Sequence, residues 1–244
     1  DTSTDMFTRP MIISVLLAGA SPAFAQSPSP EDTSEAVRVL PPIYTSDDRP
    51  DGAPGLNLEI DAAALAATSA DHPAETVNAL PGVNIQMNSG QEHLIALRSP
   101  VLTGGAGQGS FLVLENGLPT RSSAFGNVNA LFEPVHELAT SVEVVVGPGS
   151  ARYGSNAVHG LLNFGLPRPG YQEPRLHIAI SSLGRQKLDG FSAPSDDILI
   201  GAALQHDTGW RDFTGIDQQK LYLAASFELG GWEGLAWLSA SNLN

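Results

Sequence analysis

Arg152 and Tyr153 are the residues whose types and position most suggest a chemical role. They lie in the stretch from Val142 to Phe164, VEVVVGPGSARYGSNAVHGLLNF, between two apolar runs that are typical of buried strands. A cation held between buried strands must be neutralised by an opposite charge or by hydrogen bonds. The stretch therefore predicts charge pairing by Arg152 rather than bond chemistry. The alternative is an ordinary solvated arginine in a loop.

The residue patterns that bond chemistry needs are absent from the sequence. There is no cysteine, and the six histidines show neither the HxH nor the HExxH spacing of a metal site. No GxSxG motif occurs, and the glycine-rich run at 104–109 fits neither a dinucleotide loop nor a phosphate loop. The formal charge of −14 disfavours nucleic acid as a partner. We therefore expect a protein that is not an enzyme and that uses no cofactor or metal.

An export signal occupies the N-terminus. A short cationic segment precedes an apolar stretch over residues 11–20, which is too short to span a bilayer. We expect residues 1–25 to be a signal peptide with an extension before Met6, cleaved between Ala25 and Gln26. The signal predicts export, and the remaining chain has no apolar run long enough for a transmembrane helix. In a Gram-negative cell, these two features leave the periplasm, the outer membrane or the medium as the expected location.

Residues 26–59 have the composition of a flexible tether, rich in proline, serine and acidic residues. Inside it, an alternating segment is ended by Pro41 and Pro42, and it consists of Ala36, Val37, Arg38, Val39 and Leu40. A segment of this kind adds itself as a strand to the edge of a partner's sheet. A plain linker is the alternative.

Residues 60–168 have the pattern of an α+β domain with short elements. A helix is predicted from Asp71 or His72, where Pro73 suits the first turn, to the Pro81-Gly82 exit. Asn116-Gly117 predicts a tight turn. The other expected elements are strands at Val83–Met87, Leu94–Arg98, Phe111–Glu115 and Val142–Val146, and one helical turn at Glu133–Leu138.

Residues 169–244 change to segments of about ten residues that are apolar on one face and small or polar on the other, which is typical of a transmembrane β-barrel. We expect about five strands here, and a soluble antiparallel sandwich is the alternative. The expected lipid-facing rows are Leu176/Ile178/Ile180, Ile198/Ile200/Ala202/Leu204 and Leu221/Leu223/Ala225/Phe227. A lysine should be excluded at Ile200 but tolerated at Ala203, on the other face.

The stretch from Val142 to Phe164 resembles the end of the plug domain in TonB-dependent outer-membrane receptors. Upstream, ETVNALPGV is similar to the first plug helix of that family, and IALRSP and FLVLENGLPT to two plug strands. HDTGWRDFTGIDQQKLYLAAS is similar to an early barrel hairpin. The resemblance implies an α+β plug domain followed by the first antiparallel strands of an incomplete transmembrane β-barrel, as in an N-terminal fragment.

The resemblance also implies partners and sites. TonB would bind the segment Ala36–Leu40, and the outer-membrane lipid would surround the barrel strands. The receptor would import a scarce nutrient such as a ferric siderophore or cobalamin from outside the cell. The plug and the tether would face the periplasm. Contacts between plug and barrel would come from Arg98, Glu143, Gly147, Pro148, Arg152, Tyr153 and Gly154, and a ligand loop from Trp210, Arg211 and Asp212. A soluble periplasmic binding module that uses the plug-like domain alone is the alternative.

Three positions depart from the family pattern. Val146 stands where the family has lysine or arginine, His159 where it has glycine, and Asn116 where it has aspartate. The missing cation at Val146 puts the usual charge pairing between plug and barrel in doubt.

Overall fold

The computed structural model describes residues 56–68, 70–87, 93–98, 111–120, 134–170, 173–182, 184–209, 211–212 and 214–243. The chain divides into two compact units, 1–39 and 40–244, and every described residue belongs to the second. The signal peptide, its cleavage site at Ala25 and Gln26, and the segment Ala36–Leu40 lie outside the described residues.

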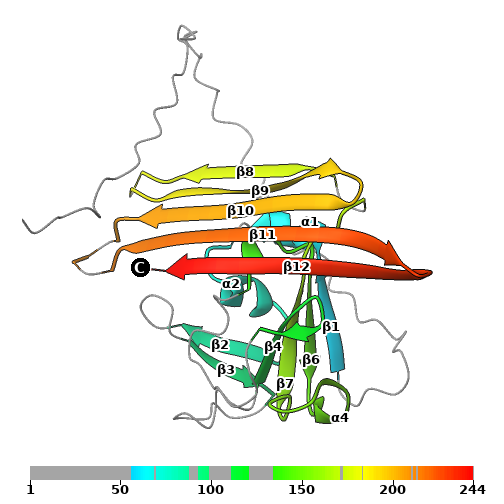
Figure 1. Cartoon of the computed structure of the whole chain (residues 1–244). Coiled ribbons are helices and arrows are strands. Elements are labelled where there is room, and N and C mark those ends of the chain that lie inside the picture. Colours follow the sequence, from blue (N-terminus) through cyan, green and yellow to red (C-terminus); the bar gives the residue numbers. More distant parts are fainter. Residues whose placement is uncertain are drawn as a thin grey trace, which may run out of the picture. The chain divides into compact units, whose positions relative to one another are not determined.

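The α+β domain contains a five-stranded sheet in the order β1-β6-β7-β4-β5 (Figure 1). Its strands are β1 (Leu56–Asp61), β4 (Phe111–Glu115), β5 (Leu118–Pro119), β6 (Ser141–Val146) and β7 (Gly160–Gly165). All neighbours are antiparallel except β4 and β7, which run parallel. A separate hairpin is formed by β2 (Val83–Met87) and β3 (His93–Leu97). The helical elements are α1 (Ala62–Thr68), α2 (Pro73–Val77), the 3₁₀ turn η1 (His136–Leu138) and α4 (Ser150–Tyr153).

Local chemistry explains the elements that the sequence predicts correctly. The Nδ1 atom of His72 accepts a hydrogen bond from the backbone N–H of Ala74 at 2.9 Å and so caps α2, with Pro73 as the first helical residue. Asn116 and Gly117 have φ angles of 48° and 83°, as a tight hairpin turn requires. Both predictions are confirmed.

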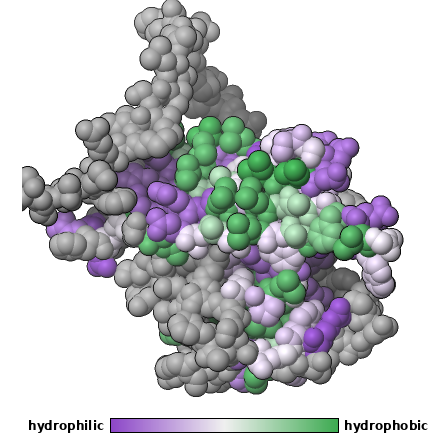
Figure 2. Space-filling model, in the orientation of Figure 1, coloured by the Kyte–Doolittle hydropathy of each residue, from purple (hydrophilic) through white to green (hydrophobic). Residues whose placement is uncertain are grey.

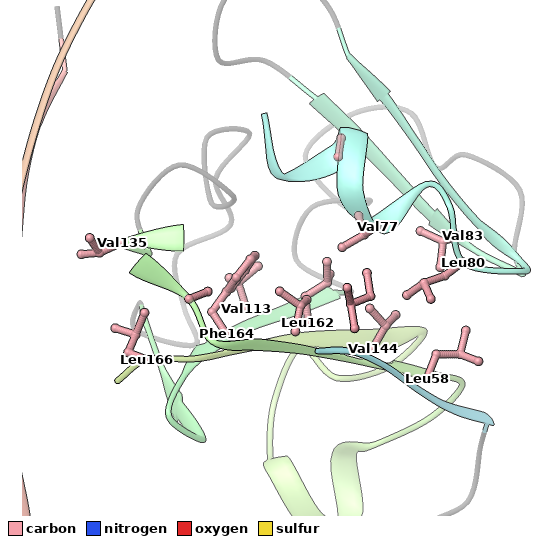
Figure 3. Close-up of a cluster of buried hydrophobic side chains, with 14 of the residues drawn as sticks. Leu58, Val77, Leu80, Val83, Val113, Val135, Val144, Leu162, Phe164 and Leu166 are labelled. Atoms are coloured by element: carbon pink, nitrogen blue, oxygen red, sulfur yellow. The ribbon is translucent and has the colours of Figure 1, made fainter. Parts of the chain in front are cut away.

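The hydrophobic core lies between the sheet and the α2 segment. Figure 3 shows Val77 and Leu80 of this segment opposite side chains of the sheet, among them Leu58 of β1, Val144 of β6 and Leu162 of β7. All five side chains are almost fully buried. β1 therefore contributes to the core, although the sequence pattern assigns most of its residues to the tether.

Five antiparallel strands form a second sheet in the order β12-β11-β10-β9-β8 (Figure 1). They are β8 (Arg175–Ile180), β9 (Gln186–Ser195), β10 (Ile198–Asp207), β11 (Ile216–Leu229) and β12 (Trp232–Leu243). Each strand pairs with the next in sequence, as in an up-and-down barrel wall. The expected number of strands and their antiparallel order are confirmed.

The two faces of the β8–β12 sheet differ in burial. In Figure 2, hydrophobic residues gather on its exposed face. The exposed large residues of the three expected rows are Leu176, Ile178, Ile180, Ile198, Ile200, Leu204, Leu221, Leu223 and Phe227. The opposite face packs against the α+β domain and shares its core cluster through Leu199, Tyr222 and Ala224. The expected outward rows thus match the exposed face.

One expectation about this sheet is wrong. Ala203 is only 4% exposed, because it lies on the face that packs against the α+β domain. At the neighbouring inward position, Gly201, an added Cβ would lie 2.5 Å from Leu138 Cδ1 of η1. A lysine at Ala203 would therefore be buried beside Lys220, its partner on β11, whereas the sequence alone predicts a position where a lysine is tolerated. No helix in the described part of the chain is both long and apolar enough to cross a membrane.

Candidate functional site

A buried ion pair joins the β8–β12 sheet to η1. The Nζ atom of Lys220, on β11, lies 2.9 Å from Oε1 and 3.1 Å from Oε2 of Glu137. The same ammonium donates to the carbonyl oxygen of Pro134 at 3.0 Å and lies 3.1 Å from Nδ1 of His136. Both charged side chains are almost completely excluded from solvent. All three N–H donors of Lys220 therefore have partners within residues 134–137, in and just before η1, and we call residues 134–139 the η1 segment.

The protonation states of the His136 and Glu137 side chains are compatible with their contacts to Lys220. Burial lowers the pKa of His136 to about 3, with the nearby Lys220 adding to the shift, so its imidazole is neutral at physiological pH. A neutral imidazole leaves one ring nitrogen as acceptor, and Nδ1 is the nitrogen that faces Lys220. Burial alone would raise the pKa of Glu137, but the charge of Lys220 and its hydrogen bonds to the carboxylate lower it, so Glu137 is ionised.

Two further side chains of the sheet hold the same segment. Arg175, on β8, donates from Nη2 to the Glu137 carbonyl oxygen at 2.6 Å and from Nη1 to that of Ala139 at 3.5 Å. Ser239, on β12, acts through Glu115 of β4: it donates to Oε2 of Glu115 at 2.8 Å, and Oε1 of the same carboxylate accepts from the backbone N–H of Val135, the residue before η1, at 2.8 Å. The η1 segment is therefore fixed by three different strands of the sheet.

The connection between α1 and α2 is held separately. Lys187, on β9, donates to the carbonyl oxygen of Ala70 at 2.9 Å. Arg185, in the β8–β9 turn, forms an ion pair with Asp71. Lys187 and Arg185 therefore fix residues 70 and 71, which precede η1 by more than 60 residues in the sequence.

A contact of Tyr222 explains why asparagine stands at position 116, where the family pattern has aspartate. The Tyr222 hydroxyl donates to the carbonyl oxygen of Pro167 at 3.1 Å, and Nδ2 of Asn116 lies 3.4 Å from the phenolic oxygen. Oδ1 of Asn116 accepts from the Leu166 N–H at 2.9 Å. Because the phenolic hydrogen is committed to Pro167, the oxygen needs a donor. The amide of Asn116 supplies one and an aspartate would not.

The arginines that the sequence singles out lie elsewhere. Arg98 is exposed, and its backbone N–H donates to the Gly82 carbonyl oxygen at 2.8 Å. Arg152 is also exposed, with its guanidinium carbon 5.4 Å from the ring centroid of Tyr153. Pairing of either arginine with a barrel carboxylate stays a prediction.

The other expected contact residues have local roles in the α+β domain. Glu143 accepts hydrogen bonds from Asn57 at 3.0 Å and Asn163 at 3.3 Å, across three neighbouring strands of its sheet. Gly147 and Gly154 have φ angles of 125° and 84°, and so allow the turns on either side of α4. Pro148 is exposed between them. A role for these residues against the barrel stays a prediction.

The expected ligand loop follows β10. Arg211 and Asp212 are exposed, and Trp210 lies outside the described residues. The Arg211 backbone is fixed locally, because its N–H donates to Thr214 Oγ1 at 3.3 Å and its carbonyl oxygen accepts from the same hydroxyl at 2.8 Å. Ligand binding by this loop stays a prediction.

Sequence reasoning missed Lys220 and Glu137 as contact residues. One signal was present, because alternation places Lys220 on the same face of β11 as Tyr222 and Ala224, opposite the apolar row Leu221/Leu223. A lysine on that face needs a buried partner. The identity of the partner does not follow from the alternation, because Glu137 precedes Lys220 by 83 residues.

Comparison with known proteins agrees with the geometry. The family model for the TonB-dependent Receptor Plug Domain matches residues 50–161. Among solved structures, the chain is similar to the ferric yersiniabactin uptake receptor FyuA from Yersinia pestis, with 18% identity, a TM-score of 0.52, and coverage of 70% of this chain and 28% of that one.

Two more structures share this fold. The pyoverdine outer-membrane receptor FpvA from Pseudomonas aeruginosa is 14% identical with a TM-score of 0.58, over 77% of this chain and 27% of that one. The ferric citrate transporter FecA is 19% identical with a TM-score of 0.58, over 79% and 31%. The chain thus spans about a third or less of the structures it matches.

The α+β domain is therefore a plug, and the β8–β12 sheet corresponds to strands of an incomplete barrel. Residues 50–161 thus match the plug domain of TonB-dependent receptors, and the fold of the chain is similar to that of solved outer-membrane receptors.

Proposed function

We propose that the chain is part of an outer-membrane receptor that imports a scarce nutrient, such as a ferric siderophore or cobalamin, with energy delivered through TonB. The observation that carries the proposal is the plug packed on one face of antiparallel strands whose other face is an exposed apolar surface. A surface of this kind suits lipid and is unfavourable in water. It therefore disfavours the soluble periplasmic module.

The proposed mechanism is gating and requires no bond chemistry. TonB pairs with the segment Ala36–Leu40 as an added strand and pulls on the tether. Since the tether leads directly into β1, the pull reaches the edge of the plug sheet first. Contacts of the η1 segment with Lys220 and Arg175 hold the plug against the wall during the pull. A path opens when part of the plug rearranges.

Uptake in matched strains tests this function. The receptor that contains this chain is expressed in cells with and without TonB, and the accumulation of radiolabelled ferric siderophores and cobalamin is measured. We expect TonB-dependent accumulation of at least one of them. Val39→Pro should abolish it because proline cannot donate to an added strand, and Val39→Ile should not. Location of the receptor in the soluble periplasmic fraction would contradict the proposal.

A further inference from the structure

A cavity of about 280 Å³ lies between the plug and strands β8 and β9. Its plug wall is mainly apolar and includes Leu65, Pro73, Val142 and Phe164. Its sheet wall carries four ionisable side chains, Arg175, His177, Lys187 and Asp189. The cavity thus has one apolar side and one charged side, as sites for small organic ions do.

The carboxylates around the cavity are already engaged. Glu137, which also lines it, is paired with Lys220. Asp189 lies 2.9 Å from Nδ1 of His177, its cross-strand neighbour. The cations of the wall, in contrast, form no ion pair within the described residues. Arg175 and Lys187 donate to backbone carbonyl oxygens instead.

Lys187 is the less satisfied of these two cations. Its side chain is 5% exposed, and within the described part of the chain its ammonium donates one hydrogen bond, to the Ala70 carbonyl oxygen. An ammonium has three donors, and a buried charge is costly unless it is both paired and hydrogen-bonded. The charges of Glu137, Asp189 and Glu75 act on this ammonium from a distance, and the cavity offers its two remaining donors to a further acceptor.

We propose that this cavity binds a small organic monoanion, with its carboxylate at Lys187 and its apolar body against Leu65, Pro73 and Phe164. The volume is just below the usual range for ligand pockets, which begins at roughly 300 Å³, so the ligand is no larger than a single substituted ring. The anion bridges the barrel wall and the α1–α2 connection. Its binding therefore strengthens the docking of the plug.

Binding of para-fluorobenzoate to the purified full chain in detergent micelles tests the proposal by fluorine NMR. The uncharged analogue para-fluorobenzyl alcohol has the same ring and controls for partition into detergent. We expect saturable line broadening of the benzoate alone, reversed by unlabelled benzoate. No saturable binding, or equal saturable binding of the alcohol, would overturn the proposal.

Two variants locate the binding. Lys187→Gln removes the charge and should weaken para-fluorobenzoate binding by roughly tenfold or more. Ala66→Leu, on the cavity side of α1, should weaken it similarly by filling the space while keeping all charges. Arg168→Gln removes an exposed cation that does not line the cavity and should leave binding unchanged. If Lys187→Gln does not fold, Ala66→Leu decides, and parental affinity in that variant would refute the site.

Discussion

The Lys220 ammonium on β11 and the Glu137 carboxylate on η1 form an ion pair at 2.9 Å that solvent scarcely reaches. The family pattern places a plug cation at the position of Val146, where this chain has none. Here the cation is on the barrel strand and the carboxylate on the plug. Charge pairing between plug and wall is thus present with the opposite polarity.

Removal of one partner of this pair should loosen the plug. Lys220→Met leaves the Glu137 carboxylate buried without its counter-ion, which typically costs about 3–5 kcal/mol. We expect greater permeability of the outer membrane to vancomycin in cells that express the variant, and release of the plug at a lower urea concentration.

A second substitution controls for the loss of charge. In Lys220→Met with Glu137→Leu no charge is left buried, and an apolar replacement of a buried pair is often neutral. This double variant should recover most of the parental urea resistance. His206→Gln, which breaks the exposed pair with Asp217, should have little effect. A Lys220→Met receptor as tight as the parent would show that the pair does not hold the plug.

Restoring the family's aspartate at position 116 should be unfavourable. Asn116→Asp keeps the acceptor for Leu166 N–H but replaces the donor to the Tyr222 oxygen with a carboxylate oxygen. We expect a loss of about 1–3 kcal/mol in the free energy of unfolding, measured by chemical denaturation. Most of this loss should disappear when Tyr222→Phe is the background, because no phenolic oxygen then faces the carboxylate. An equal loss in both backgrounds would contradict this explanation.

The plug should lose stability in mild acid through His72. Burial lowers the pKa of His72 to about 4, with His93 and Lys220 contributing, and the normal value is 6.5. Below pH 6.5 the unfolded chain therefore binds a proton that the folded plug does not. The His72 contribution to stability should fall by up to about 1.4 kcal/mol per pH unit from pH 6.5 to near pH 4 and no further below that. His136, whose pKa burial lowers to about 3, adds a loss of the same sign that is shared by the parent and by variants of His72.

Urea titrations of the parent and of His72→Asn measure this slope. Asparagine retains an oxygen that can cap α2 at Ala74 but does not titrate in this range. The variant should therefore show a shallower decline between pH 6.5 and pH 4. Identical pH profiles would exclude His72 as the cause.

Arg98 or Arg152 is predicted to form a buried ion pair, either within the plug or with a carboxylate of the barrel. If such a pair forms, Arg98→Gln or Arg152→Gln should raise leakage of large antibiotics, since a broken buried pair costs far more than a solvated charge. Their exposure in the described part of the chain leaves both side chains room for such partners. Parental leakage in both variants would mean that these arginines are solvated.

Elements fixed by local chemistry could be predicted from the sequence. The His72 cap, Pro73 and the Gly82 exit define α2 within a few residues. The Asn116-Gly117 turn depends only on backbone preferences. The rows of β10 and β11 follow from strict alternation, because one face of each strand is apolar and exposed.

Elements fixed by distant partners could not be predicted. β1 has the acidic composition of a tether, and it becomes a strand because β6 pairs with it; Asn57 bonds Glu143 across 86 residues. The Lys220–Glu137 pair depends in the same way on how the plug docks. The tolerance predicted for Ala203 failed because alternation tells which residues share a face and not what covers that face.

Assembly of two lysine variants tests the central claim, a plug docked inside a lipid-exposed sheet. Ile200 is on the exposed row of β10, and Ser226 is half-buried on the inward row of β11. A lysine in lipid costs about 2–4 kcal/mol near the midplane and much less on the inward face. The measurement is the heat-modifiable, folded receptor in the outer-membrane fraction. Our account predicts that Ile200→Lys abolishes this species while Ser226→Lys retains it, and equal amounts of folded receptor from both variants would contradict it.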